Sequence, residues 1–310
     1  MVEPGSLLRA ARETAGISLR AMAERTYYSP AYLSLIESGK RPVPAGVAAA
    51  YERVLGADLD RLTAVARSPA SVDAMTLADV AVMLSATRRI EDAAGAVTVL
   101  PAVRGMSAMT ETFAREARTR TARTEVAALA SEVVQYRAWL EHAIGADSAA
   151  RATMRTAIDL AEESRDPDRL VHALGFAGYV TVSTGDYGKV IALSDAALAV
   201  RDAHPTLVAY GRMRRAELLA ARGESREAGR ALAAAEPEAA NDPPQSMYWW
   251  TPGFAAVQRA GVLALLGHTA DAVREATHGV AAMPAEHRGT AWLASALRRV
   301  DPDMSADGSR

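Results

Sequence analysis

Residues 18–42, SLRAMAERTYYSPAYLSLIESGKRP, decide the fold of the N-terminal part of the chain. Ser18 and Ser29 each precede a short run with apolar residues at helical spacing, and a serine in that position caps the first backbone N–H groups of a helix. Pro30 follows Ser29 directly, where a missing N–H costs nothing, and Gly39 can end the second run. The stretch therefore predicts two short helices separated by a tight turn.

Three more helices are expected around these two. Residues 7–15 form an apolar-periodic run that ends at Gly16, residues 45–55 form another that ends at Gly56, and Asp58 can cap a last run that carries Leu59, Leu62 and Val65. The sequence thus predicts five short helices between Ser6 and Ala66. Two short helices joined by a tight turn, the second with small and polar residues facing outward, are the helix-turn-helix layout.

The run at residues 18–42 resembles the XRE, or phage-repressor, family of helix-turn-helix transcription regulators. The resemblance rests on a small residue at the helix crossing, a serine cap, and apolar and polar residues at the end of the second helix, namely Ala23, Ser29, Leu33, Ile36, Glu37 and Gly39-Lys40. It implies that residues 1–67 form an XRE-type DNA-binding domain. It also implies that residues 29–38 enter the major groove.

The resemblance further implies which residues bind DNA. Pro30, Ala31, Ser34 and Leu35 would lie nearest the base edges, and the rest of the interface would be Ser18, Arg20, Ser29, Tyr32, Lys40 and Arg41, mostly at phosphates. The family also pairs an arginine with a glutamate at the positions of Arg12 and Glu37, and we expect that pair to be structural. The alternative is a protein-docking module without DNA binding, because a fold does not fix a function.

Two residues depart from the family pattern. Leu19 stands where the family often has a glutamine, and Tyr27 stands where it often has a glycine. The first change removes an amide that could hydrogen-bond DNA, and the second puts a bulky side chain where positive φ is usual. We therefore expect thymine-methyl contacts and DNA shape to carry much of the sequence preference.

The composition of the 310-residue chain favours an all-α protein of two domains. Half of the residues are hydrophobic but only 5% are aromatic, and alanine is common, which suits closely packed helices. The absence of cysteine excludes disulfides and thiolate chemistry and suits a reducing cytoplasm. Because the chain has no signal-peptide pattern and no apolar run near 18 residues, we expect neither secretion nor a membrane span.

Charge and motifs indicate binding rather than catalysis. The net charge of −2 divides unevenly, since residues 1–67 carry nine Lys and Arg against seven Asp and Glu, and the rest of the chain carries 26 against 30. No HExxH, P-loop, GxGxxG or GxSxG motif and no paired zinc-ligand spacing occurs. The sequence predicts a protein that is not an enzyme and has no cofactor and no metal site.

The middle of the chain, residues 68–106, is interpreted as a linker and a connecting helix. A Ser/Pro stretch at residues 68–71 precedes a helical pattern over about residues 76–93. The sequence AGAVTVLPAVRG, residues 94–105, is expected to break the chain before helices at about 107–118 and 124–144.

Residues 107–300 carry a repeating pattern of small residues around four glycines, Gly145, Gly185, Gly223 and Gly267. Small or short side chains recur at fixed offsets from them, at Ala138, Gly178, Ala216 and Ala260, at Ala150, Val190, Ala228 and Ala272, and at Ala157, Ala197, Ala235 and Gly279. The pattern resembles degenerate tetratricopeptide repeats, an α-solenoid of helix pairs with a glycine turn in each pair. The alternative is coincidence in an alanine-rich helical chain. Residues 301–310 are expected to be a disordered tail.

In such arrays the first helix of each pair lines the concave binding face. The register places there the candidate ligand-binding residues Glu132, Gln135, Trp139, His142, His172, Tyr179, Tyr210, Met213, Glu217 and Phe254. These aromatic side chains could equally fill gaps between helices. Residues 247–250 could form a lid or pack onto the last helix pair.

Together these patterns predict a cytoplasmic, homodimeric transcription regulator that binds double-stranded DNA. The repeat domain would serve dimerisation and bind a peptide, small-molecule or protein effector. Several peptide-pheromone sensors share this architecture. The alternative function is a repeat scaffold that binds a protein partner and uses its N-terminal domain for docking.

Overall fold

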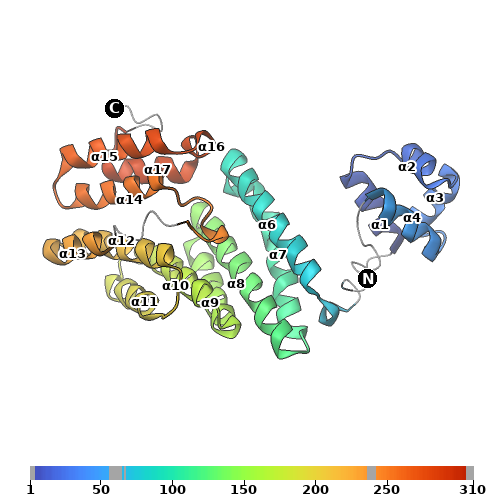
Figure 1. The fold of residues 1–310 in the computed structure, drawn as a ribbon, viewed down its shortest axis with the longest axis horizontal. Coiled ribbons are helices and arrows are strands. Elements are labelled where there is room, and N and C mark those ends of the chain that lie inside the picture. The colour runs from blue at the N-terminus through green and yellow to red at the C-terminus, as the bar shows by residue number, and fades with distance from the viewer. Residues whose placement is uncertain (1–3, 56–64, 66–67, 236–241, 305–310) are drawn as a thin grey trace. The chain divides into compact units, whose positions relative to one another are not determined.

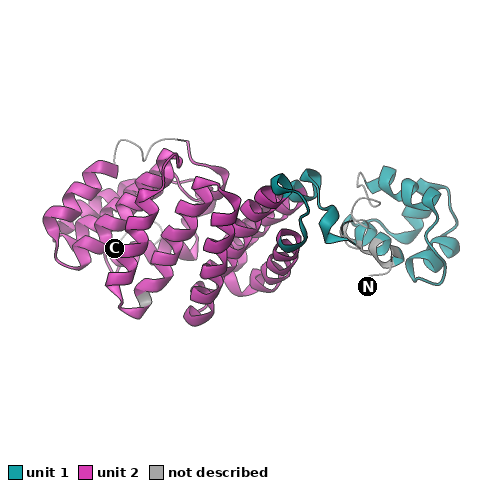
Figure 2. Ribbon diagram, turned by 90° about the horizontal axis from the view of Figure 1, so that it is seen from below, with its two compact units in different colours: residues 1–78, 115–122 teal, residues 79–114, 123–310 magenta. Residues whose placement is uncertain are grey.

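The computed structural model describes residues 4–55, 65, 68–235 and 242–304, and every regular element in this part of the chain is helical (Figure 1). The chain forms two compact units (Figure 2). The first comprises residues 1–78 and 115–122, and the second comprises residues 79–114 and 123–310. The expectation of an all-α protein is confirmed for the described residues.

Four short helices form the body of the first unit, namely α1 (Pro4–Thr14), α2 (Leu19–Thr26), α3 (Pro30–Glu37) and α4 (Ala45–Leu55). Ser18 Oγ accepts a hydrogen bond from the Ala21 N–H at 3.1 Å, and Ser29 Oγ accepts one from the Tyr32 N–H at 3.2 Å. These caps start α2 and α3 where the sequence places them. The fifth helix, expected from Asp58, falls on residues 56–64 and lies outside the described residues.

The four helices pack around one small core. Its buried side chains come from every helix and are Leu8, Met22, Ala23, Leu33, Ile36, Val47 and Tyr51. Each helix is too short to be stable alone in water, so burial of these side chains is what holds the unit together.

Beyond a short 3₁₀ helix η1 (Pro69–Ser71), two long helices follow, α6 (Ala74–Ala94) and α7 (Ala96–Glu116). The break expected over residues 94–105 is wrong, because only Gly95, at φ 83°, interrupts the helix and α7 then runs through Pro101. Proline removes one helical hydrogen bond, but α7 buries an apolar face on both sides of it, at Val99, Val103 and Met106. Packing thus outweighs the local signal that we used.

The second unit continues as paired helices. They are α8 (Arg120–Ala143), α9 (Asp147–Ser164), α10 (Pro167–Thr181), η2 (Val182–Thr184), α11 (Tyr187–Ala199), α12 (Pro205–Ala221), α13 (Ser225–Ala235), η4 (Gln245–Met247), α14 (Pro252–Leu265), α15 (Thr269–Ala282), α16 (Ala285–Arg288) and α17 (Ala291–Val300). Within the array α10 contacts α12, and α12 contacts α14 (Figure 1). The first helices of successive pairs therefore lie along one surface.

The four register glycines lie at the turns of four helix pairs, α8/α9, α10/α11, α12/α13 and α14/α15. All four have positive φ, between 73° and 85°, which glycine adopts without steric cost. The small residues at the fixed offsets are buried, and Ala138, Ala216 and Ala260 are fully inaccessible. The second unit is thus an α-solenoid of tetratricopeptide-like pairs.

The last helices close the array. α17 packs against α14 and α15, and its buried side chains join the same core as those of α12 to α15. The expected tail begins later than residue 301, because Met304 is buried in that core. Residues 305–310 lie outside the described residues.

Candidate nucleic-acid interface and enclosed cavity

Helix α3 presents two contrasting faces. Leu33, Ile36 and Glu37 are buried against the other helices. Pro30, Ala31, Ser34 and Leu35 are exposed on the opposite face, and Ser38 continues it. A helix of this diameter fits the major groove of B-form DNA, and this exposed face is mostly small or apolar. Ser34 is its one hydrogen-bonding side chain inside the helix.

Positive and hydroxyl groups surround this face. Arg20, Ser29, Lys40 and Arg41 are all exposed. The Arg41 guanidinium lies 5.6 Å from the centre of the Tyr32 ring, which holds it beside the N-terminal half of α3. Ser18 and Ser29 use their oxygens as caps and keep their O–H groups for donation to an acceptor.

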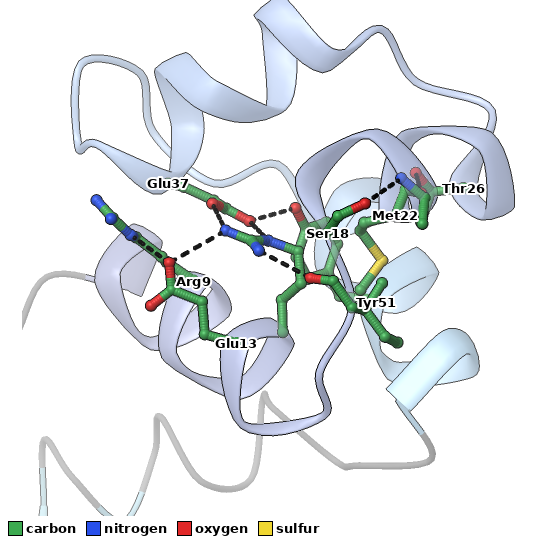
Figure 3. A network of polar contacts seen from close by, with 10 residues as sticks. Arg9, Glu13, Ser18, Met22, Thr26, Glu37 and Tyr51 are labelled. Atoms are coloured by element: carbon green, nitrogen blue, oxygen red, sulfur yellow. Dashed lines mark hydrogen bonds and ion pairs between the residues drawn. The ribbon is translucent and has the colours of Figure 1, made fainter.

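A buried polar network fixes the end of α3 (Figure 3). Arg12 Nε and Nη2 donate to the two carboxylate oxygens of Glu37, each at 2.7 Å, and Tyr51 Oη donates to Glu37 Oε1 at 2.8 Å. Arg12 also donates to the Ile17 carbonyl at 2.9 Å. The bond to Glu37 raises the pKa of Arg12, and burial raises the pKa of Tyr51. The pair expected to be structural therefore ties α1, α3 and α4 together.

Tyr27 ends α2 in the left-handed conformation, at φ 61°, with its side chain 95% exposed. A non-glycine residue there costs energy that a glycine would not. The backbone therefore has the shape that the family's usual glycine would give, although the residue differs.

The second unit contains a cavity of about 770 Å³, measured as all space outside atoms and including its opening. Its lining comes from α6, α8, α10, α12, α14, α17 and residues 246–249, and consists of Arg88, Glu91, Gln135, Tyr136, Trp139, His172, Phe176, Tyr179, Tyr210, Arg214, Ser246, Tyr248, Trp249, Phe254, Gln258, Trp292, Ser295 and Arg299.

Aromatic rings form most of the wall. The chain has only three Phe, four Trp and nine Tyr, yet Tyr136, Trp139, Phe176, Tyr179, Tyr210, Tyr248, Trp249, Phe254 and Trp292 all line this one cavity. Many meet edge to face, for example Phe254 and Trp292 with ring centres 4.9 Å apart. Rings packed against one another hold a rigid surface, as a preformed site requires.

Two clusters of charged side chains lie at the cavity, and in each cluster two arginines share one glutamate. Glu132 is shared by Arg88 at 2.8 Å and Arg169 at 2.5 Å. Burial opposes the charge of Glu132, but the two arginines outweigh it and hold the pKa of that carboxyl below its usual range. Glu217 in turn is shared by Arg214 and Arg299.

Two titratable groups of the lining have shifted pKa values. Burial, with Asp92 beside it, raises the pKa of Glu91 to about 7. Burial, reinforced by Arg169, lowers the pKa of His172 to about 3, so this imidazole is neutral at neutral pH. Among the described residues, no group of three or more His, Asp or Glu is arranged to hold a metal ion.

Residues 5–65 match the family model described as a helix-turn-helix domain. The N-terminal helices are a helix-turn-helix domain. Helices α2 and α3 are its two characteristic helices, and the buried network lies at its centre. The matched segment is about a fifth of the chain and does not extend into the solenoid.

One solved structure is similar over most of its length. It is PlcR of Bacillus thuringiensis, in complex with the peptide PapR7 and DNA, with 12% sequence identity, 90% of this chain and 94% of that chain covered, and a TM-score of 0.41. No curated protein matches the sequence. In the described part of the chain, no helix has the length and hydropathy needed to cross a membrane.

All the DNA-binding candidates of the helix-turn-helix domain lie at or beside α3 or at the start of α2. All are exposed except Tyr32, which is half-buried under Arg41. Their role stays a prediction.

Six of the ten ligand-binding candidates line the cavity, and they are Gln135, Trp139, His172, Tyr179, Tyr210 and Phe254. The structure does not bring the other four to its wall. Met213 is buried in the core, and His142 bonds to Asp147 at 2.6 Å. Glu132 and Glu217 do not line the cavity, but each pairs with an arginine that does, Arg88 and Arg214 respectively.

Twelve of the eighteen residues that line the cavity were not among the ligand-binding candidates. Arg88 and Glu91 lie on α6, which precedes the repeats, and Trp292 and Arg299 lie on α17, which follows them. Phe176 and Arg214 belong to the helices that we singled out, at one turn from Tyr179 and Tyr210, and a helical-wheel count would have found them. The segment at residues 246–249 lines the cavity, while Met247 and Trp250 are buried.

Proposed function

We propose that the chain is a sequence-specific DNA-binding transcription regulator that acts in the cytoplasm. The observation that carries this proposal is the exposed face of α3, at Pro30, Ala31, Ser34 and Leu35, on a helix-turn-helix domain. None of these four side chains belongs to the core of the domain, and cationic side chains flank them. A helix that contacts bases in a DNA groove needs both features. Ala31 and Leu35 would contact thymine methyl groups, Ser34 would bond to a base edge, and Lys40 and Arg41 would meet phosphates.

The test of this proposal is selection of bound genomic fragments by the native protein and by the variant Ala31→Asp. The substitution puts a carboxylate on an exposed position of α3 and should leave the fold unchanged, while it opposes entry into a negatively charged groove. We expect the native protein to enrich a defined set of fragments and the variant to lose them.

Two results would contradict the proposal. Equal retention of the same fragments by Ala31→Asp would remove α3 from the groove. No retention of DNA by the native protein at about 50 mM salt, where non-specific affinity is strong, would leave the docking-module alternative. The melting temperature of Ala31→Asp should equal that of the native protein, so that either result refers to binding.

We further propose that the second unit forms the homodimer contact through α6. Val82, Met83 and Ile90 lie within one exposed sector of this helix and are 68%, 52% and 52% exposed. A second copy would cover this apolar sector and place two α3 helices for the half-sites of a roughly palindromic operator. The variant Val82→Glu/Ile90→Glu should sediment as a monomer if the native protein is a dimer. A variant that remains dimeric would exclude this face, and its melting temperature checks that the second unit is still folded.

We also propose that the cavity binds the effector of the regulator. Its support is a preformed volume, an aromatic wall and buried polar groups within one unit. Effector binding would change the DNA affinity only if the chain has two conformations that differ in their affinity for the effector. The expected readout is a shift in the salt-matched DNA affinity when the effector is added.

A further inference from the structure

The cavity wall has more guanidinium groups than carboxylates to neutralise them. Arg214 and Arg299 both lie against the single carboxylate of Glu217, the second at 3.5 Å. Arg214 is largely enclosed and its guanidinium lies 4.8 Å from the ring centre of Tyr179, in the same wall. One positive charge at this place is therefore left without a partner carboxylate, in surroundings of low polarity where a charge interacts strongly.

A second cluster of charged groups lies on the other side of the cavity. Glu132 is nine-tenths buried and is shared between Arg88 and Arg169, and Arg88 also faces the rings of Tyr136 and Tyr248. The acidic groups nearest to Arg88 on its own helix are Glu91 and Asp92, and burial raises the pKa of both. The surplus of guanidinium groups over carboxylates is therefore at Arg214 and Arg299, which share one carboxylate, and not at Arg88.

One buried nitrogen of the wall has no hydrogen-bond partner in the described part of the chain. His172 is 5% exposed and lines the cavity, and among the described residues its Nε2 has no hydrogen-bond partner. An unpaired buried nitrogen costs free energy unless a ligand or water bonds to it. The His172 ring meets the Phe176 ring edge to face, with ring centres 5.0 Å apart.

We propose that the cavity takes a compact aromatic carboxylic acid, with its carboxylate at Arg214 and Arg299, its ring between the aromatic side chains, and a polar substituent at His172 Nε2. This inference rests on the proposed effector role of the cavity and specifies the class of ligand. A cationic ligand would face the surplus guanidiniums, and a neutral ligand would leave them unpaired. Only an anion satisfies both the charge and the rings.

The test uses isothermal titration calorimetry on the full chain with matched probes. The probes are benzoate, indole-3-acetate and naphthalene-1-acetate, each compared with its own amide and with the corresponding amine. We expect the native protein to bind at least one acid on the order of tenfold more tightly than its amide, since a hydrogen bond to a charged group is the stronger kind. The amines should bind more weakly still.

The variant Arg299→Gln separates charge recognition from general loss of structure. Arg299 lines the cavity and its side chain is 35% exposed, so its replacement should not unfold the protein. It should reduce the preference for acid over amide to a few-fold or less. Arg298→Gln, the exposed neighbour that does not line the cavity, should keep the full preference. Melting temperatures of both variants check that the second unit remains folded.

The carboxylate could belong to a small acid or to the C-terminus of a peptide. A hexapeptide of five alanines and a C-terminal tryptophan distinguishes the two. A compact acid should bind more tightly than this peptide, because the cavity must enclose the whole ligand. Tighter binding of the peptide would overturn the assignment to a small acid. Amides or amines that bind as well as the acids, or no binding of any probe at millimolar concentration, would overturn the inference as a whole.

The proposed function and this inference fail separately. A native protein that enriches genomic fragments but binds no acid remains a regulator and loses only the ligand class. A native protein that binds an acid with the expected preference but retains no DNA keeps the ligand class and loses the regulatory role.

Discussion

At the scale of single residues, Glu37 is the most connected side chain of the helix-turn-helix domain. It accepts hydrogen bonds from Arg12 and from Tyr51, and all three side chains are buried. Removing one partner of a buried ion pair leaves the other charge without compensation, and this costs more than the pair itself contributes.

Glu37→Ala should lower the free energy of unfolding of the first unit by on the order of 3 kcal/mol, because Arg12 is then buried without its carboxylate. Urea denaturation monitored by circular dichroism measures this loss. Glu24→Ala is the control, since Glu24 is exposed and its ion pair with Arg20, at 3.5 Å, is a surface pair that contributes little. A Glu37→Ala variant as stable as Glu24→Ala would mean that the network is open to water in solution.

Glu91 should make the stability of the second unit depend on pH. Its pKa is raised to about 7 by burial and by Asp92, while the neighbouring Tyr136 on α8 lowers it. Arg88 on the same helix and Tyr248 from the segment at 246–249 also lie in this wall. A carboxyl whose folded pKa is raised contributes stability at low pH, and that contribution is lost as the pH rises from about 4.5 to about 7.

The variant Glu91→Gln removes this titration. Its stability relative to the native protein should therefore increase as the pH is raised through the same range, and thermal melts at pH 5 and pH 8 measure the difference. The comparison of two proteins cancels the opposite effect of His172, whose lowered pKa favours the folded state at higher pH. A constant difference between the two proteins would show that Glu91 titrates normally.

At the scale of elements, close helix packing depends on single glycines. A Cβ on Gly253 of α14 would lie 2.4 Å from the Gly279 carbonyl oxygen of α15, whereas a Cβ on Gly261 of α14 would have no atom within 4 Å. The two glycines share a helix and differ only in what faces them. They thus separate helix propensity from packing.

Gly253→Ala should destabilise the second unit by roughly 1 to 3 kcal/mol, because α14 and α15 must move apart. Gly261→Ala should stabilise it by up to about 1 kcal/mol, because alanine is the better helix former. Urea denaturation of the two variants gives both values. Effects of the same sign would contradict the close approach of the two helices.

The sequence predicted the glycine turns of the pairs because positive φ and small residues at crossings leave a local signature. Gly145 and Gly267, for example, were placed at turns from spacing alone. The start of α7 could not be predicted in this way, because Pro101 is a strong local signal for a break and the burial of Val99 and Val103 depends on helices elsewhere in the chain. Tertiary packing decided that element.

At the scale of the whole molecule, the small basic excess of residues 1–67 should appear in the salt dependence of DNA binding. Changing Lys40 and Arg41 together to Ala should weaken binding to all sequences. It should also reduce the slope of log K against log salt by about 2 per subunit, since each phosphate contact contributes about 0.9. Fluorescence anisotropy at several salt concentrations measures the slope. An unchanged slope would place both side chains away from phosphate.

The cavity shows why its full lining was beyond sequence analysis. The repeat register placed six of its residues, because the first helices of the pairs line one surface. Part of the remaining wall comes from α6 and α17, which stand outside the repeat period. Trp292 Nε1 donates to Asp92 Oδ1 at 2.9 Å, a contact between residues 200 positions apart, and no local pattern predicts such a closure.

That hydrogen bond also sets an order of events during synthesis. The ribosome releases α6 early and α17 late. Asp92 therefore cannot accept the hydrogen bond from Trp292 until the chain up to that residue, 200 positions later, has been synthesised. Until α17 arrives, the cavity has an open end and its aromatic side chains are exposed to water. A nascent chain therefore cannot hold its effector before that helix has folded, and a ligand present during translation would stabilise only chains that have passed this point.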